Sequence, residues 1–297
     1  MKKNRNRPNT SKRKPKAEGG PKSEMKKGKR TPNKLSIKID KNPLKTERVI
    51  KESDEIRLNK FIAHAGLCSR RDADKYIVDG KVKINGNTVT ELGVSVRRSD
   101  KVEVDGQRVS LEPFVYLLLN KPRNTITTTD DEKGRNTVLD EIEDATGARV
   151  YPVGRLDRNT TGLLILTNDG DLTHRLTHPS YKVRKTYEVE SERELTDTEL
   201  AQLGKGVELE DGIAKGHNIQ KYSDVSKTIL ISVYEGRNHL IRRMVKHFGT
   251  EVTKLKRVEY AGLNLKDVRV GRWRFLRQNE VNSLRKQVKL EPLDFKK

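Results

Sequence analysis

One carboxylate in this chain stands where it could do chemistry. Asp157 lies in the segment 153–162, Val-Gly-Arg-Leu-Asp-Arg-Asn-Thr-Thr-Gly, with Arg155 two residues before it and Arg158 directly after it. Positive charges near a carboxylate favour its ionised form, and an ionised aspartate can act as a nucleophile or base without a metal or cofactor. The same residues would also suit an exposed ion pair in a surface turn. Taken alone, the segment leaves both interpretations open.

Signatures of metal and cofactor enzymes are missing from the sequence. It contains none of the patterns G-x-x-x-x-G-K-[ST], G-x-G-x-x-G and G-x-S-x-G. His174 and His178 lie four residues apart, but they have no intervening glutamate and no nearby third ligand. We therefore expect a mechanism that is built on a carboxylate, with no metal and no cofactor.

The charge of the chain predicts a polyanionic partner. The formal net charge is +21, and residues 1–50 account for +14 of it, with 18 Lys and Arg against 4 Asp and Glu. Residues 1–54 have almost no large apolar side chain before Leu35. Such a segment is expected to be a disordered basic tail that binds phosphates without sequence preference, or else merely a solubilising one.

The compartment follows from simple features of the sequence. One cysteine, Cys68, fits a reducing environment. No apolar run approaches the roughly 20 residues of a membrane helix, and the N-terminus lacks the apolar core of a secretory signal. A transit peptide is a weaker alternative, because the basic residues are mostly Lys. We expect a cytoplasmic protein that does not bind membranes and is a monomer.

A small domain is expected over residues 55–112. Apolar residues recur at helical spacing over 58–65, and Ser69 would cap a second helix. Two alternating runs then reach the turn dipeptides Asn85-Gly86 and Asp105-Gly106, which are typical of β-hairpins. The pattern predicts a helical pair followed by a short twisted sheet.

This helical pair and sheet resemble the S4 RNA-binding domain. The residues that carry the resemblance lie in 57–60, 66–71, 73–80 and 82–86. The S4 family binds structured RNA with basic side chains on its helices. The resemblance implies RNA contacts for Arg57, Lys60, Arg70 and Arg71, although these could also be a solvated helix face.

A larger α+β domain is expected over residues 113–290. The runs 114–119 and 163–166 are apolar throughout, which is typical of strands buried on both faces. An apolar stripe over 241–248 predicts a helix, and Asp171 would cap another. Several strands with intervening helices and mostly hairpin-length connections predict a mixed or antiparallel sheet.

Seven motifs, in order along residues 119–258, resemble the RsuA/RluB/RluE/RluF family of ribosomal RNA pseudouridine synthases, whose members carry an N-terminal S4 domain. The resemblance as a whole covers about residues 56–280. A chance match of this kind is negligible, so the surface-turn interpretation of Asp157 loses most of its weight. The motifs are Leu119-Asn120-Lys121-Pro122, residues 154–164, Leu166-Thr167-Asn168-Asp169-Gly170, Leu176-Thr177-His178-Pro179, Lys185-Thr186-Tyr187, Gly236-Arg237-Asn238 with Ile241-Arg242-Arg243-Met244, and Leu255-Lys256-Arg257-Val258.

The resemblance implies a reaction and roles for residues. The family detaches uracil from its sugar at N1, turns it in the site and rejoins it through C5. Asp157 matches the essential aspartate, which attacks the sugar, attacks the base or removes the C2′ proton. Tyr187 matches a tyrosine that stacks on the base, and Arg242 an arginine that pairs with the aspartate. Arg155 and Lys185, near the site, would hold flanking phosphates.

The expected substrate is 23S rRNA of the large subunit, free or in a pre-ribosomal particle, because the motifs look most like the RluB branch. The alternatives are 16S rRNA as substrate, or a catalytically idle RNA-binding or ribosome-assembly factor that retains the fold. A glycoside hydrolase would need a second carboxylate opposite the first. Two departures from the family pattern, at Arg123-Asn124 and Leu240, put RNA contacts rather than catalysis in doubt.

Overall fold

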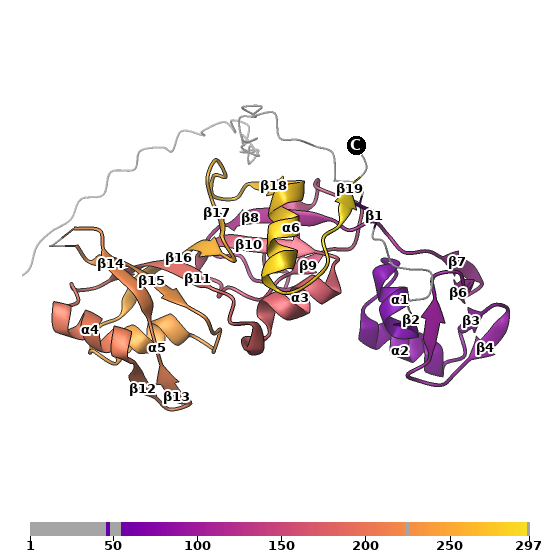
Figure 1. Cartoon of the computed structure of the whole chain (residues 1–297), viewed down its shortest axis with the longest axis horizontal. Coiled ribbons are helices and arrows are strands. Elements are labelled where there is room, and N and C mark those ends of the chain that lie inside the picture. The colour runs from indigo at the N-terminus through magenta and orange to yellow at the C-terminus, as the bar shows by residue number, and fades with distance from the viewer. Residues whose placement is uncertain (1–45, 48–54, 224–225, 296–297) are drawn as a thin grey trace, which may run out of the picture. The chain divides into compact units, whose positions relative to one another are not determined.

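The computed structural model describes residues 46–47, 55–223 and 226–295 of the chain (Figure 1). The chain divides into two units, residues 1–37 and 38–297, and all described residues belong to the second. The basic tail expected over residues 1–54 thus lies outside the described residues, apart from Thr46–Glu47. These two form β1 and pair antiparallel with β19 (Asp294–Phe295), which the sequence did not predict. None of the described helices is long and apolar enough to span a membrane.

The first part of the described chain contains the expected helical pair and hairpins. Ser69 caps the second helix, since its hydroxyl accepts the backbone N–H of Asp72 at 3.2 Å. Leu58, Ile62 and Ile77 are almost fully buried between the helices and the strands. The elements are β2 (Glu55–Arg57), α1 (Leu58–His64), α2 (Arg70–Val78), β3 (Val82–Ile84), β4 (Asn87–Val89), β5 (Ser95–Arg97), β6 (Val102–Val104) and β7 (Gln107–Val109).

A large mixed sheet organises the rest. Its strand order is β14-β15-β11-β16-β10-β8-β18, with β9 paired to β10 and β17 to β16. The β10–β16 pair is parallel, whereas the other described pairs in this sheet are antiparallel, which confirms the α+β prediction. The strands are β8 (Tyr116–Lys121), β9 (Tyr151–Pro152), β10 (Thr161–Thr167), β11 (Lys185–Ser191), β14 (His217–Lys221), β15 (Thr228–Val233), β16 (Val252–Tyr260), β17 (Leu263–Asn264) and β18 (Trp273–Phe275).

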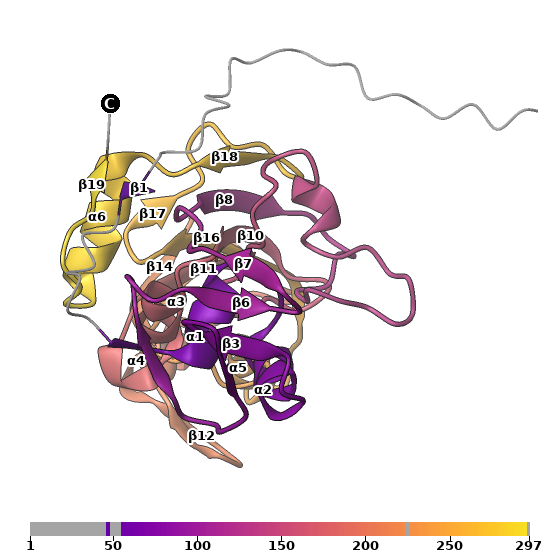
Figure 2. The same cartoon turned by 90° about the vertical axis from the view of Figure 1, so that its right-hand side faces the viewer.

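Helices and apolar loops cover both faces of this sheet. On β8, Tyr116 and Leu118 face a cluster that includes α3 and α6, while Leu117 and Leu119 face a second cluster, as expected for a strand buried on both sides. Helix α6 lies next to β17 in both views (Figures 1 and 2). The remaining elements are η1 (Asp140–Ile142), α3 (Gly170–Thr177), η2 (Pro179–Tyr181), α4 (Asp197–Lys205), β12 (Val207–Leu209), β13 (Gly212–Ala214), α5 (Leu240–Lys246) and α6 (Gln278–Gln287).

Asp169, and not Asp171 as the sequence suggested, caps α3. Its Oδ1 accepts the backbone N–H of Leu172 at 3.1 Å. Its Oδ2 accepts hydrogen bonds from the Tyr116 hydroxyl at 2.8 Å and from the Arg285 guanidinium at 2.6 Å. The Asp169 and Arg285 side chains are only 1% and 4% exposed. This buried ion pair joins α6 to the start of α3, and its partners are too distant in sequence for local spacing to reveal.

Replacing Asp169 should cost the fold considerable stability. The variant Asp169→Asn leaves the Arg285 guanidinium buried without its counter-charge. We expect the free energy of unfolding, measured by urea titration, to fall by about 3–5 kcal/mol. The control is Glu251→Gln, which removes an exposed ion pair with Lys246 at 3.8 Å and should cost less than about 1 kcal/mol. Equal losses in the two variants would contradict the importance of the buried pair.

Candidate active site

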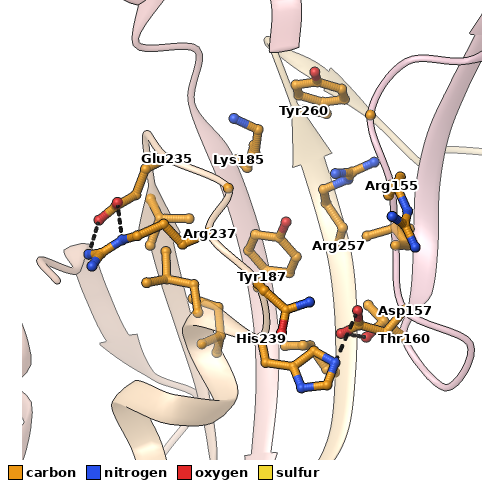
Figure 3. Close-up of a pocket in the computed structure, with 18 of the residues that line it drawn as sticks. Arg155, Asp157, Thr160, Lys185, Tyr187, Glu235, Arg237, His239, Arg257 and Tyr260 are labelled. Atoms are coloured by element: carbon orange, nitrogen blue, oxygen red, sulfur yellow. Dashed lines mark hydrogen bonds and ion pairs between the residues drawn. The ribbon is translucent and has the colours of Figure 1, made fainter. Parts of the chain in front are cut away.

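A cavity of about 420 Å³ brings together segments that lie far apart in the sequence (Figure 3). One wall is the loop between β9 and β10, which carries Asp157 and Arg155. Strands β11 and β16 supply the floor, including Tyr187. The segment 235–241, which leads into α5, forms the third side. Asp157 and Tyr187, both singled out by the sequence, therefore line the same cavity.

The Asp157 carboxylate has two polar side chains near it. Its Oδ1 lies 3.5 Å from Nε2 of His239, which carries a charge only when protonated. The hydroxyl of Thr160 donates to Oδ2 at 3.5 Å. The side chain of Asp157 is 39% exposed, so a substrate entering the cavity can reach it.

Lys121 holds the loop that carries Asp157. Its side chain is fully buried, and its Nζ donates to the carbonyl oxygens of Pro122 at 3.1 Å, Arg158 at 3.2 Å and Thr160 at 2.8 Å. Two of these carbonyls follow Asp157 closely in the chain, so the ammonium group fixes the loop where it leaves the carboxylate. Burial lowers the pKa of Lys121 to about 8, although the negative charge of Asp157 acts in the opposite direction.

Two cations and two tyrosines occupy the floor. Tyr187 on β11 pairs in register with Arg257 on β16. Lys185 Nζ and Arg257 Cζ lie 5.6 Å and 4.6 Å from the ring centroid of Tyr260. Burial, followed by the charge of Arg257, lowers the pKa of Lys185 to about 8. The floor thus combines the ring of Tyr187, which can stack on a base, with buried positive charge.

Arg242 does not make the ion pair with Asp157 that was expected. Its Nη1 donates to the carbonyl oxygen of Val252 at 3.0 Å, and Arg242 does not belong to the cavity lining. The reason is the packing of α5, which buries Ile241, Met244 and Val245 and leaves Arg242 beside the start of β16. In this structure His239 stands next to the carboxylate instead.

The residues expected to hold flanking phosphates differ in exposure. Both Arg155 and Lys185 line the cavity. Arg155 is exposed, whereas Lys185 is only 8% exposed. Arg155 therefore suits a phosphate at the surface, but Lys185 lies deeper than that role requires.

The predicted RNA-binding residues of the helical pair also fall into two groups. Arg70 and Arg71 are exposed in the first turn of α2. Lys60 Nζ forms an ion pair with Asp171 Oδ1 at 2.6 Å, and Arg57 donates to a backbone carbonyl before β5. Arg70 and Arg71 are thus the two with no internal acceptor among the described residues, and they are the better candidates for phosphate contacts.

Sequence reasoning missed the roles of Lys121, Arg257 and His239. Lys121 and Arg257 stand in two of the seven motifs, so the sequence marked both positions without showing what they contact. The feature of the sequence that could have revealed them is a charged residue within a strand that buries apolar side chains: Lys121 is the last residue of β8, and Arg257 lies inside β16. Within the described ranges, no group of three His, Cys, Asp or Glu side chains is placed to hold a metal ion.

Comparisons with known proteins agree with this geometry. Residues 115–247 match the RNA pseudouridylate synthase family, and residues 56–102 match the S4 domain family. A protein of Bacillus subtilis named ribosomal large subunit pseudouridine synthase B is 46% identical over 234 residues, which cover 77% of this chain and 95% of that protein. The chain belongs to the RNA pseudouridine synthases.

Two further relatives extend the match. An uncharacterized RNA pseudouridine synthase of Aquifex aeolicus is 44% identical over 80% of this chain and 96% of its own length. The crystal structure of a pseudouridylate synthase superposes with a TM-score of 0.56 at 29% identity, covering 77% of this chain and 99% of that one. The expected RsuA/RluB-type enzyme with an N-terminal S4 domain is therefore confirmed, whereas the exact domain limits stay predictions.

The buried charge of Lys121 predicts a specific dependence of stability on pH. Because its pKa is about 8 in the folded chain against an ordinary value of 10.5, the folded state releases this proton first. Between pH 8 and 10.5 the unfolded state holds more protons, so stability should rise with pH. Relative to Lys121→Met, the free energy of unfolding of the wild-type synthase should rise by up to about 1.4 kcal/mol per pH unit. Denaturant titrations at several pH values test this, and parallel curves throughout would contradict it.

Proposed function

We propose that this synthase isomerises a uridine of 23S rRNA, in the large ribosomal subunit, with Asp157 as its catalytic carboxylate. The observation that carries the proposal is that Asp157 and Tyr187, thirty residues apart, line one cavity. The name of the Bacillus subtilis relative supports the choice of the large subunit. The substrate places the enzyme in the cytoplasm, acting on free rRNA or a pre-ribosomal particle.

The reaction requires one reactive group and a side chain that binds the base. The bond between sugar C1′ and uracil N1 breaks, and a bond between C1′ and C5 forms. C5 loses a proton and N1 gains one, so the product is an isomer of the substrate. Asp157 acts on C1′, on the base or on the C2′ proton. Tyr187 stacks on the base, a contact worth about 1–3 kcal/mol.

The target nucleotide must leave its RNA stack before it can reach Asp157. This costs a few kcal/mol and costs least in loops. Phosphate contacts offset part of the cost, and we assign them to the exposed Arg155 at the cavity and to Arg70 and Arg71 on α2. Lys60 and Arg57 are the weaker candidates, because each already has a partner within the protein.

The variant Asp157→Asn tests the catalytic role. The amide keeps the size of the side chain but cannot act as a nucleophile or base. We expect pseudouridine formation in a 23S rRNA transcript to fall by at least about 1,000-fold, while the dissociation constant for the RNA changes less than about threefold. Pseudouridine is mapped by chemical modification and primer extension.

The same assay separates the alternatives. Pseudouridine in the 16S transcript but not in the 23S transcript would indicate that the substrate is the rRNA of the small subunit. No product in either RNA, with binding intact, would support an idle RNA-binding factor and contradict the proposal. Release of free uracil would indicate a glycoside hydrolase.

The S4 contacts can be tested through salt dependence. In the double variant Arg70→Ala, Arg71→Ala, the slope of log affinity against log salt should fall by about 2, because each phosphate contact contributes about 1. The matched control removes two exposed lysines elsewhere, in Lys286→Ala, Lys289→Ala. Fluorescence titrations over a range of KCl concentrations give both slopes. If the two variants share the wild-type slope, the assignment to α2 is wrong.

A further inference from the structure

Two buried cations in the cavity have no ion-pair partner; the negative charge of Glu235 acts on Lys185 only from beyond salt-bridge distance. Arg257 is 2% exposed and Lys185 is 8% exposed, and both line the cavity. Among the residues that the structure describes, no carboxylate oxygen lies within salt-bridge distance of either group. Buried charges in proteins are normally paired, because an unpaired one is costly. Two neighbouring positive charges that are buried without an ion-pair partner therefore indicate that the cavity binds an anionic ligand.

Arg257 has a donor ready for that ligand. Its Nε donates to the carbonyl oxygen of Leu163 at 2.8 Å, and its guanidinium lies 4.6 Å from the ring centroid of Tyr260. These two contacts fix the plane of the guanidinium. Its Nη2 is buried and has no hydrogen-bond partner. Figure 3 shows the group between Tyr260 and Asp157, at the edge of the cavity floor.

The backbone places Arg257 close to the Asp157 loop. Gly162, at the start of β10, pairs in parallel with Arg257 of β16. A Cβ at Gly162 would overlap the carbonyl oxygen of Arg257, and the φ of Gly162 is +107°, so this close approach requires glycine. The loop that carries the carboxylate and the strand that carries the cation are thus in direct contact.

We propose that Arg257 and Lys185 bind the carbonyl edge of the target uracil and stabilise the negative charge that it carries while detached from the sugar. This inference rests on the proposed function and assigns catalytic roles to these two residues. It gives Arg257 a role that the sequence did not predict. It also moves Lys185 from a phosphate contact to a contact with the base.

The charge arises in the bond-breaking step. When the C1′–N1 bond breaks, its electron pair stays on the base, which becomes a monoanion shared between N1 and the adjacent carbonyl oxygen. C1′ loses that electron pair. It gains a new one either from a bond to an Asp157 oxygen or from the C2′–H bond, whose proton passes to Asp157. Later C5 bonds to C1′ while the C1′–Asp157 bond breaks or, in the other case, while Asp157 returns its proton to C2′. C5 then loses its proton, and N1 takes up a proton. Fixed positive groups beside the base lower the energy of the anion.

The depth of the two cations favours the base over a phosphate. A flanking phosphate stays on the RNA backbone outside the cavity, where the exposed Arg155 is available. The ring of Tyr187, which lines the cavity beside the cations, offers an apolar face suited to a planar ligand. A phosphate is therefore the competing outcome in the test below.

The test separates binding from the rate of reaction in the variants Arg257→Gln and Arg257→Lys. With enzyme in excess over a 23S rRNA stem-loop, Arg257→Gln should lower the single-turnover rate by about 100-fold. The dissociation constant should stay within about twofold of wild type. Arg257→Lys, which keeps the charge, should recover at least about tenfold of the lost rate. The control Arg269→Gln makes the same change at an exposed position and should leave both quantities unchanged.

A second arm identifies the ligand. The stem-loop is prepared with an uncharged methylphosphonate on the 5′ or the 3′ side of the target. If the base is the ligand, the 100-fold ratio between wild type and Arg257→Gln persists on both RNAs. If the ratio disappears on either one, the cation binds that phosphate, and the inference is overturned. It is also overturned if Arg257→Gln weakens RNA binding without slowing the reaction, or if Arg257→Lys recovers nothing.

The assay also distinguishes failure of the proposed function from failure of this inference. In that case the wild-type enzyme itself produces no pseudouridine in 23S rRNA, and both proposals fall together. An active wild type with an equally active Arg257→Gln overturns the inference alone. Thermal unfolding of each variant checks the fold, and Arg257→Lys keeps the test decisive if the glutamine variant does not fold.

Discussion

The position of the Asp157 carboxylate depends on one buried ammonium group. Lys121, at the end of β8, reaches three carbonyl oxygens with three donors, and two of these belong to the loop just after Asp157. A loop cannot satisfy its carbonyls by strand pairing, so a cation that donates to several of them is an efficient anchor. Burial of the charge is costly, and the hydrogen bonds offset that cost. The active-site loop is thus tied to the most buried strand of the sheet.

A second set of bonds fixes the opposite side of the cavity. The guanidinium of Arg237 donates to Glu235 at 2.7 Å and to the carbonyl oxygens of Gly212 and Ile213 at 2.9 Å each. It therefore joins the segment before α5 to the β12–β13 hairpin. The same segment ends at His239, which has a left-handed backbone (φ +50°) and brings its imidazole to Asp157. Two independent anchors, one lysine and one arginine, hold the walls that face each other.

The sequence predicted what local patterns control. Ser69 caps its helix as expected, because the cap bonds to a residue three positions away. The run 114–119 gave a buried strand because its apolar pattern leaves no polar face. The failures concern bonds across the fold. Asp169 caps α3 while also pairing with a residue 116 positions later, and the orientation of Arg242 depends on how α5 packs. Family resemblance supplied Asp157 and Tyr187, which spacing alone could not join.

Negative and positive side chains lie at different ends of the cavity. In the view of Figure 3, Asp157 and His239 lie toward one end and Lys185 and Tyr260 toward the other, with Tyr187 between them. A glycosidic bond that breaks heterolytically leaves electron deficiency on the sugar and negative charge on the base. In the proposed arrangement, Asp157 lies at the sugar while Lys185 and Arg257 lie at the base. These fixed charges stabilise the separated charges without having to reorganise as the bond breaks. In the same proposal, these cations also restrain the detached base while it turns. The proposal implies that a site without these cations would still bind RNA through the exposed Arg155, Arg70 and Arg71, but would leave the negative charge of the detached base unstabilised.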